Sequence, residues 1–133
     1  MKKGYHENME SISLKNSNFR EVLYTSEYCQ LVLMSLKPNE EIGLETHNGN
    51  DQFFRFEKGE GELIINETKY QIGDGDVVIV PKGASHNIIN TSSENDLKLY
   101  TIYSPAHHKD KTLHRTKQDS ETNEAPFDGK TSE

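Results

Sequence analysis

The sequence contains a single cysteine, Cys29, and far fewer basic than acidic residues. One cysteine excludes an intrachain disulfide and a cysteine-based zinc site. Because Cys29 begins the apolar stretch 29–33, we expect it to be a small buried hydrophobic residue. The formal net charge of −7 opposes binding to phosphate backbones and to anionic lipid surfaces. Nucleic acid is therefore not an expected partner.

Long apolar runs are also missing. No run approaches the roughly 20 residues that cross a bilayer, and the N-terminus leads into polar residues instead of the apolar centre of a signal peptide. We therefore expect a cytoplasmic protein without a membrane partner. Only 32% of the 133 residues are hydrophobic, which predicts one compact core and much solvated surface.

Apolar residues are scarcest near the C-terminus. In the range 104–133 only Ala106, Leu113, Ala125 and Phe127 are apolar. Such a stretch buries too little surface to offset the entropy lost on ordering. The expected organisation therefore has three parts, which are an N-terminal segment (1–19), a barrel that ends in a C-terminal strap (20–114) and a mobile polar tail (115–133).

The central region consists of short β-rich runs separated by turn residues, a pattern typical of an antiparallel sandwich or barrel. We expect strands at 21–25, 29–36, 41–47, 52–58, 61–65, 69–72, 77–80, 85–90 and 97–103. Helical periodicity is nearly absent there and in the residues that precede it. The run 31–34 is apolar on both faces, so this strand should be covered on both sides. The second cover is either another subunit, which would make a homodimer, or an N-terminal segment of the same chain.

Two of the six histidines lie among other metal-ligating residue types. Glu45 and His47 are two residues apart, so on a strand they share one face, and Gln52 follows after a short loop. His86 follows a turn and can supply a second imidazole from a distant part of the sequence. Two imidazoles, one carboxylate and one amide oxygen suit iron, manganese, nickel, cobalt or zinc.

The remaining candidate ligands carry less weight. His107 and His108 are adjacent, so in an extended chain they point to opposite sides, and His114 lies in the polar C-terminal segment. We expect all three to be solvated or locally hydrogen-bonded. Asp51 is expected to support a turn and not to bind metal.

The segment 75–90 matches the second cupin motif, G-x(5)-P-x-G-x(2)-H-x(3)-N, at every defined position. These positions are Gly75, Pro81, Gly83, His86 and Asn90. The segment 39–59 resembles the first cupin motif, G-x(5)-H-x-H-x(4)-E-x(6)-G. It departs from that motif at Asn39 in place of glycine, Glu45 in place of histidine and Gln52 in place of glutamate.

The chain thus resembles a small single-domain cupin of the mannose-6-phosphate isomerase-like type. This resemblance implies an all-β fold, a double-stranded β-helix or jelly-roll barrel, that holds one divalent metal ion. Carried over to this sequence, the implied ligands are Glu45, His47, Gln52 and His86, of which only the two histidines keep the usual residue type.

Three functions remain open. The leading hypothesis is a metal-binding cupin that acts on a small organic substrate, with the metal as Lewis acid or as the site of oxygen binding. The alternatives are a non-catalytic module that binds a small molecule or a metal, and a sugar or sugar-phosphate isomerase. An isomerase needs a base, and the sequence offers none beyond the ligands. The sequence does not decide whether the protein is an enzyme, and if it is one, whether it is an oxygenase or an isomerase.

Overall fold

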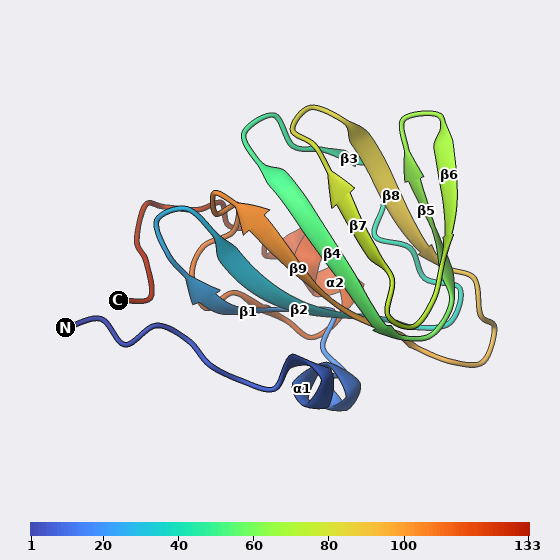
Figure 1. Ribbon diagram of the computed structural model, residues 1–133, viewed down its shortest axis with the longest axis horizontal. Coiled ribbons are helices and arrows are strands. Elements are labelled where there is room, and N and C mark those ends of the chain that lie inside the picture. Colours follow the sequence, from blue (N-terminus) through green and yellow to red (C-terminus); the bar gives the residue numbers. More distant parts are fainter.

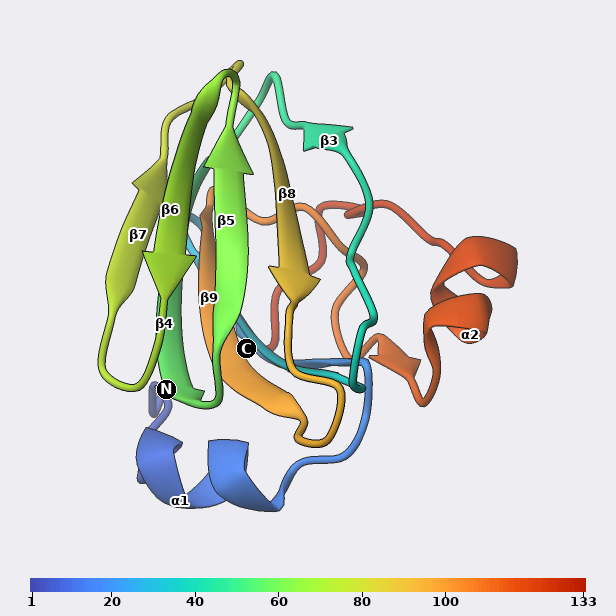
Figure 2. The same cartoon turned by 90° about the vertical axis from the view of Figure 1, so that its right-hand side faces the viewer.

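The computed structural model describes residues 1–133, and its strands form two antiparallel sheets that face each other (Figures 1 and 2). One sheet has the order β10-β1-β2-β9-β4-β7 and the other β3-β8-β5-β6. The strands are β1 (Arg20–Thr25), β2 (Gln30–Leu36), β3 (Glu45–Thr46), β4 (Asp51–Lys58), β5 (Gly61–Ile65), β6 (Thr68–Ile72), β7 (Val77–Val80), β8 (Ser85–Asn90), β9 (Leu97–Ser104) and β10 (Leu113–His114). The predicted all-β jelly-roll barrel is confirmed. Neither of the two short helices is long or apolar enough to span a membrane.

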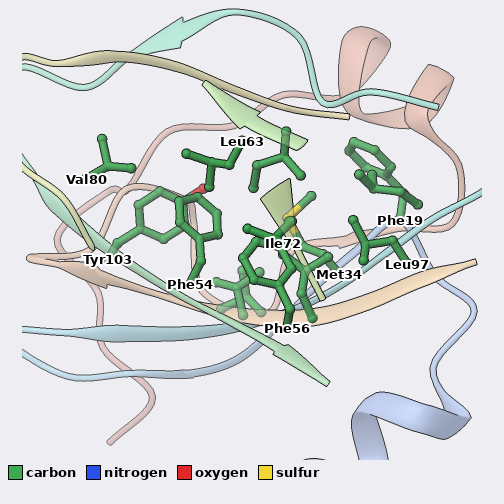
Figure 3. Close-up of a cluster of buried hydrophobic side chains, with 14 of the residues drawn as sticks. Phe19, Met34, Phe54, Phe56, Leu63, Ile72, Val80, Leu97 and Tyr103 are labelled. Atoms are coloured by element: carbon green, nitrogen blue, oxygen red, sulfur yellow. The ribbon is translucent and has the colours of Figure 1, made fainter. Parts of the chain in front are cut away.

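The core lies between the two sheets and follows from strand alternation. Along β4, Gln52, Phe54 and Phe56 are buried while their neighbours are not, and β9 alternates in the same way. Figure 3 shows the cluster, with Tyr103 and Val80 at one end and Phe19 and Leu97 at the other. The apolar core therefore fills most of the barrel, and the buried polar residues Gln52 of β4 and Thr101 of β9 lie toward the Tyr103 end.

The predicted strand 41–47 is wrong in most of its length. Only Glu45–Thr46 forms a strand, and Glu41 adds an isolated bridge to Ile89. Gly43 has a φ of 107°, outside the extended region, and its N–H donates to the Asn87 side chain instead of a backbone carbonyl. This segment therefore runs alongside β8 as an irregular connection, as Figure 2 shows.

The expectation that the N-terminal residues lack a helix is also wrong. Residues Met9–Lys15 form α1, whose N-cap Asn8 accepts a hydrogen bond from the Ser11 N–H. The helix packs against β2, β4 and β9 on the outer face of the six-stranded sheet (Figure 1). A helix of seven residues is too short to show an amphipathic period clearly.

Cover on both faces of β2 is confirmed, because five consecutive residues, 32–36, are buried. Leu33 on the outer face is only 4% exposed and lines a groove with residues of the N-terminal segment and α1. The same chain therefore supplies the second cover. A homodimer stays a prediction.

The C-terminal segment is built into the fold. Residues Lys117–Thr122 form α2, which begins with a capping box between Thr116 and Asp119. The last residues reach the first ones, since the Glu133 carboxylate accepts hydrogen bonds from the Lys3 and Gly4 N–H groups. The segment thus has a helix and hydrogen bonds that its composition does not indicate, and its mobility stays a prediction.

Cys29 is exposed, so its predicted burial is wrong. It lies immediately before β2 in the turn that Ser26 closes, and its carbonyl accepts the Ser26 N–H at 2.9 Å. The apolar run begins to be buried only after Cys29, at Gln30.

Candidate functional site

The fold distributes the four sequence-predicted ligands over three strands and one loop. Glu45 is on β3, Gln52 on β4 and His86 on β8, while His47 immediately follows β3. Glu45 and His86 are direct cross-strand partners in the β3–β8 ladder. One ligand atom from each of Glu45, His47 and His86 lies within 4.8 Å of the others. We call Glu45, His47, Gln52 and His86 the barrel-mouth cluster.

Glu45 and His47 are in direct contact, with 3.1 Å between Glu45 Oε2 and His47 Nε2. Burial alone would raise the pKa of Glu45, but the hydrogen bond and charge of His47 and the charge of Arg20 outweigh it. The pKa of Glu45 is therefore held below its ordinary value. Its side chain is 32% exposed, whereas that of His47 is 8% exposed. Glu45 is thus an ionised carboxylate at the open edge of the cluster.

His86 presents a defined ring nitrogen to the same site. Its Nδ1 lies 3.3 Å from the Ala84 carbonyl oxygen, which accepts only, so Nδ1 carries the proton and Nε2 keeps its lone pair. Burial lowers the pKa of His86, partly offset by this backbone contact. A neutral imidazole with a free Nε2 is the form that binds a metal ion.

Gln52 is only 3% exposed and lies on the inner face of β4, two residues before Phe54. Its Nε2 donates to Thr101 Oγ1 at 3.0 Å, which fixes the amide. Its Oε1 is buried and has no hydrogen-bond partner. A buried carbonyl oxygen without a partner costs about 1–3 kcal/mol. A metal ion that Gln52 Oε1 binds would remove this cost, so the chain's donor set fits the divalent ion that the motifs imply.

Residues outside the motifs complete the surroundings, and sequence analysis missed them. The His107 ring lies 4.3 Å from the His47 ring, and the Tyr103 ring lies 5.6 Å from it, measured between centroids. Burial, with the charges of His108 and His47, lowers the pKa of His107 to about 4. Burial also raises the pKa of the Tyr103 hydroxyl, which stays protonated. Only Tyr103 carried a signal, its inward position on a strand that alternates.

The segment that carries His107 is held by the side chain of Gln30, which is fully buried. Gln30 Oε1 accepts the N–H groups of His107 and His108, and Gln30 Nε2 donates to the His108 carbonyl. Asn50 donates hydrogen bonds to the Pro105 and Ala106 carbonyls. These bonds tie the strap, residues 104–114, to the loop after His47. These bonds close the strap over the end of the barrel.

Of the two outcomes expected for the other histidines, solvation is wrong for His108 and His114, which are each only 2% exposed. Both rings instead contact nearby groups, since His108 Nε2 lies 3.2 Å from the Tyr103 hydroxyl and His114 Nε2 lies 3.2 Å from the Asn123 carbonyl oxygen. His114 Nδ1 lies 3.3 Å from Arg20 Nη1, and Arg20 is itself buried. Asp51 behaves as expected, because it is exposed and its Oδ1 accepts the Lys82 N–H.

The barrel-mouth cluster lies beneath the surface. None of the pockets in the structure is lined by its four residues. His47, Gln52 and His86 are each 9% exposed or less, which leaves the Glu45 edge as the part in contact with solvent.

Comparison with known proteins agrees with this architecture. The cupin domain family matches residues 32–103. The uncharacterized protein L612 of Acanthamoeba polyphaga mimivirus is 47% identical over 107 residues, which are 78% of this chain and 67% of L612. The crystal structure of BH2720 from Bacillus halodurans has a TM-score of 0.88 and 34% identity, and the match covers 90% of this chain and 95% of that one.

A third similarity is more limited. The oxalate-binding protein of Thermotoga maritima is 33% identical over 69 residues, which are 52% of this chain and 56% of that protein. The family match spans more than half of the present chain and contains the whole barrel-mouth cluster. On these grounds the chain belongs to the cupin family.

Proposed function

We propose that this cupin binds one divalent metal ion through Glu45, His47, Gln52 and His86 and that the ion binds a small organic substrate. The observation that carries the proposal is the buried, unpartnered Gln52 Oε1 at the same end of the barrel as two imidazoles and a carboxylate. Two nitrogen and two oxygen donors suit iron, manganese, nickel, cobalt or zinc.

The charge of the donor set favours an anionic or carbonyl-containing ligand. Glu45 is the single anion among the four residues, so a divalent ion keeps a formal charge of about +1 there. The buried Arg20 adds positive potential, as the lowered pKa of Glu45 reflects. When bound, the ion would supply a Lewis acid or a site for oxygen.

The surrounding residues limit which ligands fit. Tyr103 and His107 place two rings against His47, and the strap is fixed by Gln30 and Asn50. A ligand therefore has to be small, or the strap has to move, and the Glu45 edge is the side from which it would approach. The rings also exclude water from the inner side of the cluster.

The two alternative functions receive unequal support. An isomerase needs a base that is poised near neutral pH. His107 is the nearest further imidazole, and its pKa of about 4 makes it a weak base. Non-catalytic capture of a small dicarboxylate is favoured by the similarity to the oxalate-binding protein and is kept as the second candidate.

The direct test is elemental analysis of protein purified without added metal. We expect about one equivalent of a transition metal in the wild type and loss of that equivalent in His47→Ala and in His86→Ala. His6→Ala is the matched control, since His6 is exposed and far from the motifs in sequence. Undiminished metal in both site variants would refute the proposed ligands.

Oxygen uptake and ligand binding then separate the two functions. An oxygenase loaded with iron consumes oxygen when its substrate is present, whereas a binding module does not. Calorimetric titration of the metal-loaded protein with oxalate tests whether the protein binds a small dicarboxylate. Binding that disappears in His86→Ala supports it, and no detectable binding rejects it.

A further inference from the structure

A second group of ligand-type side chains lies outside the cupin motifs. His107, His108 and Glu124 each place one ligand atom within 4.8 Å of the others. We call these three residues the strap cluster. It adjoins the barrel-mouth cluster, because the ring of His107 contacts that of His47 at 4.3 Å.

The strap cluster is held by regular backbone contacts. The chain pairs 107–109 with 125–127, through an isolated bridge between His108 and Pro126 and hydrogen bonds from Lys109 N–H to Ala125 and from Phe127 N–H to His107. Glu124 lies between this pairing and the end of α2. Figure 2 shows α2 on the same side of the barrel as β3, which carries Glu45.

His108 has a buried ring nitrogen without a satisfactory partner. Its Nε2 lies 3.2 Å from the Tyr103 hydroxyl. Its Nδ1 lies 3.3 Å from Glu124 Oε1, but the direction is poor for an N–H···O bond, so Nδ1 forms no hydrogen bond. His108 is 98% buried. When Nε2–H donates to the Tyr103 hydroxyl, Nδ1 carries a lone pair beside the Glu124 carboxylate, and a cation that binds both would relieve their repulsion.

We propose that His107, His108 and Glu124 form a second divalent metal site. With metal–ligand bonds of about 2.1 Å, an ion between atoms 3.3 Å apart makes an angle of about 100° with them, between the octahedral and tetrahedral values. A bond from His108 Nε2–H to the Tyr103 oxygen would fix the orientation of the ring, as the outer hydrogen bond of a metal-binding histidine does.

Charge and ligand type set the class of ion. Arg20 Nη1 lies 3.9 Å from the other oxygen of Glu124 and opposes a cation there. The site therefore binds more weakly than the barrel-mouth cluster, and two imidazoles favour zinc, cobalt or nickel over magnesium or calcium. Three protein ligands leave a position for water or a small ligand.

The test is the binding stoichiometry of Co²⁺ measured by equilibrium dialysis of the full chain. We expect two equivalents in the wild type and one in Glu124→Gln, which keeps the size of the side chain. Glu121→Gln is the matched control, because Glu121 is an exposed residue of α2 and undergoes the same change of charge. It should keep two equivalents.

A second variant guards against indirect effects of the first. His108→Asn should also bind one equivalent, and its circular dichroism should stay that of the wild type. If it unfolds, Glu124→Gln decides the question, since the Glu124 side chain is 47% exposed and is not part of the apolar core. A wild type that binds one equivalent, or a Glu124→Gln variant that keeps two, overturns the proposal. In that case Tyr103, His108 and Glu124 form a purely structural contact.

The same Co²⁺ dialysis experiment separates this proposal from the proposed function. His86→Ala removes a ligand of the barrel-mouth cluster alone and should keep the equivalent that Glu124→Gln loses. One equivalent lost only through His86→Ala leaves the proposed function standing and rejects the second site. One equivalent lost only through Glu124→Gln supports the second site and rejects the ligands of the proposed function.

Discussion

The barrel-mouth cluster and the strap cluster contain similar side chains, but the chain assembles them in different ways. Glu45 and His86 face each other across a strand ladder, so the register of β3 and β8 fixes their distance. Glu124 meets His108 only because a polar C-terminal segment folds back on the strap. A site on paired strands is rigid and visible in sequence motifs, whereas a site made by a returning segment depends on that segment staying in place.

The largest expected effect concerns the support beneath the barrel-mouth cluster. Phe56 is fully buried and stacks on Phe54, whose ring lies 6.0 Å from that of His86. Phe56→Ala should lower the free energy of unfolding by about 3–5 kcal/mol in urea denaturation, because it leaves a cavity in the core.

The matched control is Phe53→Ala on the outer face of the same strand, where Phe53 is only partly buried. It should cost about 1 kcal/mol, mainly through its contact with Tyr100. Equal losses in the two variants would contradict the view that the inner face of β4 supports the site.

Removal of residues 116–133 should have an intermediate effect on stability. It should remove the strap cluster and leave the barrel-mouth cluster intact. The truncation deletes Glu124 and the Ser132 contacts to Thr25, but it keeps the Arg115 carbonyl that accepts the Phe19 N–H. We expect the β spectrum to remain, with a loss of about 1–3 kcal/mol as Arg20 loses a partner. Thermal unfolding measures this loss. An unfolded product would show that the barrel needs the C-terminal segment.

The smallest expected effect is on the pH dependence of stability in metal-free protein. In the unfolded chain His107 takes up a proton below about pH 6.5, whereas in the folded chain its pKa is about 4. The folded state therefore loses stability as the pH falls from about 6.5 to 4, on the order of 1 kcal/mol for this residue after allowance for its partial exposure.

His107→Gln should remove this part of the acid sensitivity. Urea denaturation at neutral pH and at a pH between the two pKa values, with a chelator present, measures the difference. An unchanged slope between wild type and variant would mean that His107 is protonated equally in both states.

The sequence predicted the barrel well because alternation and turn residues are local signals. The sequence predicts a strand at 52–58, and the structure buries alternate residues of it, Gln52, Phe54 and Phe56. The spacing of Gly75, Pro81 and His86 identified the second motif. The segment 41–47 failed because the φ of Gly43 and its bond to the Asn87 side chain depend on residues far away in the sequence.

The strap and the C-terminal segment were not predictable in the same way. His108 is buried by contacts with Gln30, Tyr103 and Glu124, which lie 78, 5 and 16 residues away. The composition of the last residues shows that few of them are apolar. It gives no information on the hydrogen bonds that determine their positions. Polar networks of this kind depend on tertiary geometry, so adjacent histidines such as His107 and His108 look solvated from sequence alone.

Chelator competition tests most directly whether the barrel-mouth cluster, Glu45, His47, Gln52 and His86, holds a metal ion. Glu45→Gln removes the only anionic ligand and should weaken retention of the ion by about tenfold or more, equivalent to at least about 1.4 kcal/mol. Gln52→Glu adds a second anion of nearly the same size and should strengthen it. From tightest to weakest retention, we expect the order Gln52→Glu, wild type, Glu45→Gln. Retention by Glu45→Gln at or above the wild-type level would contradict it.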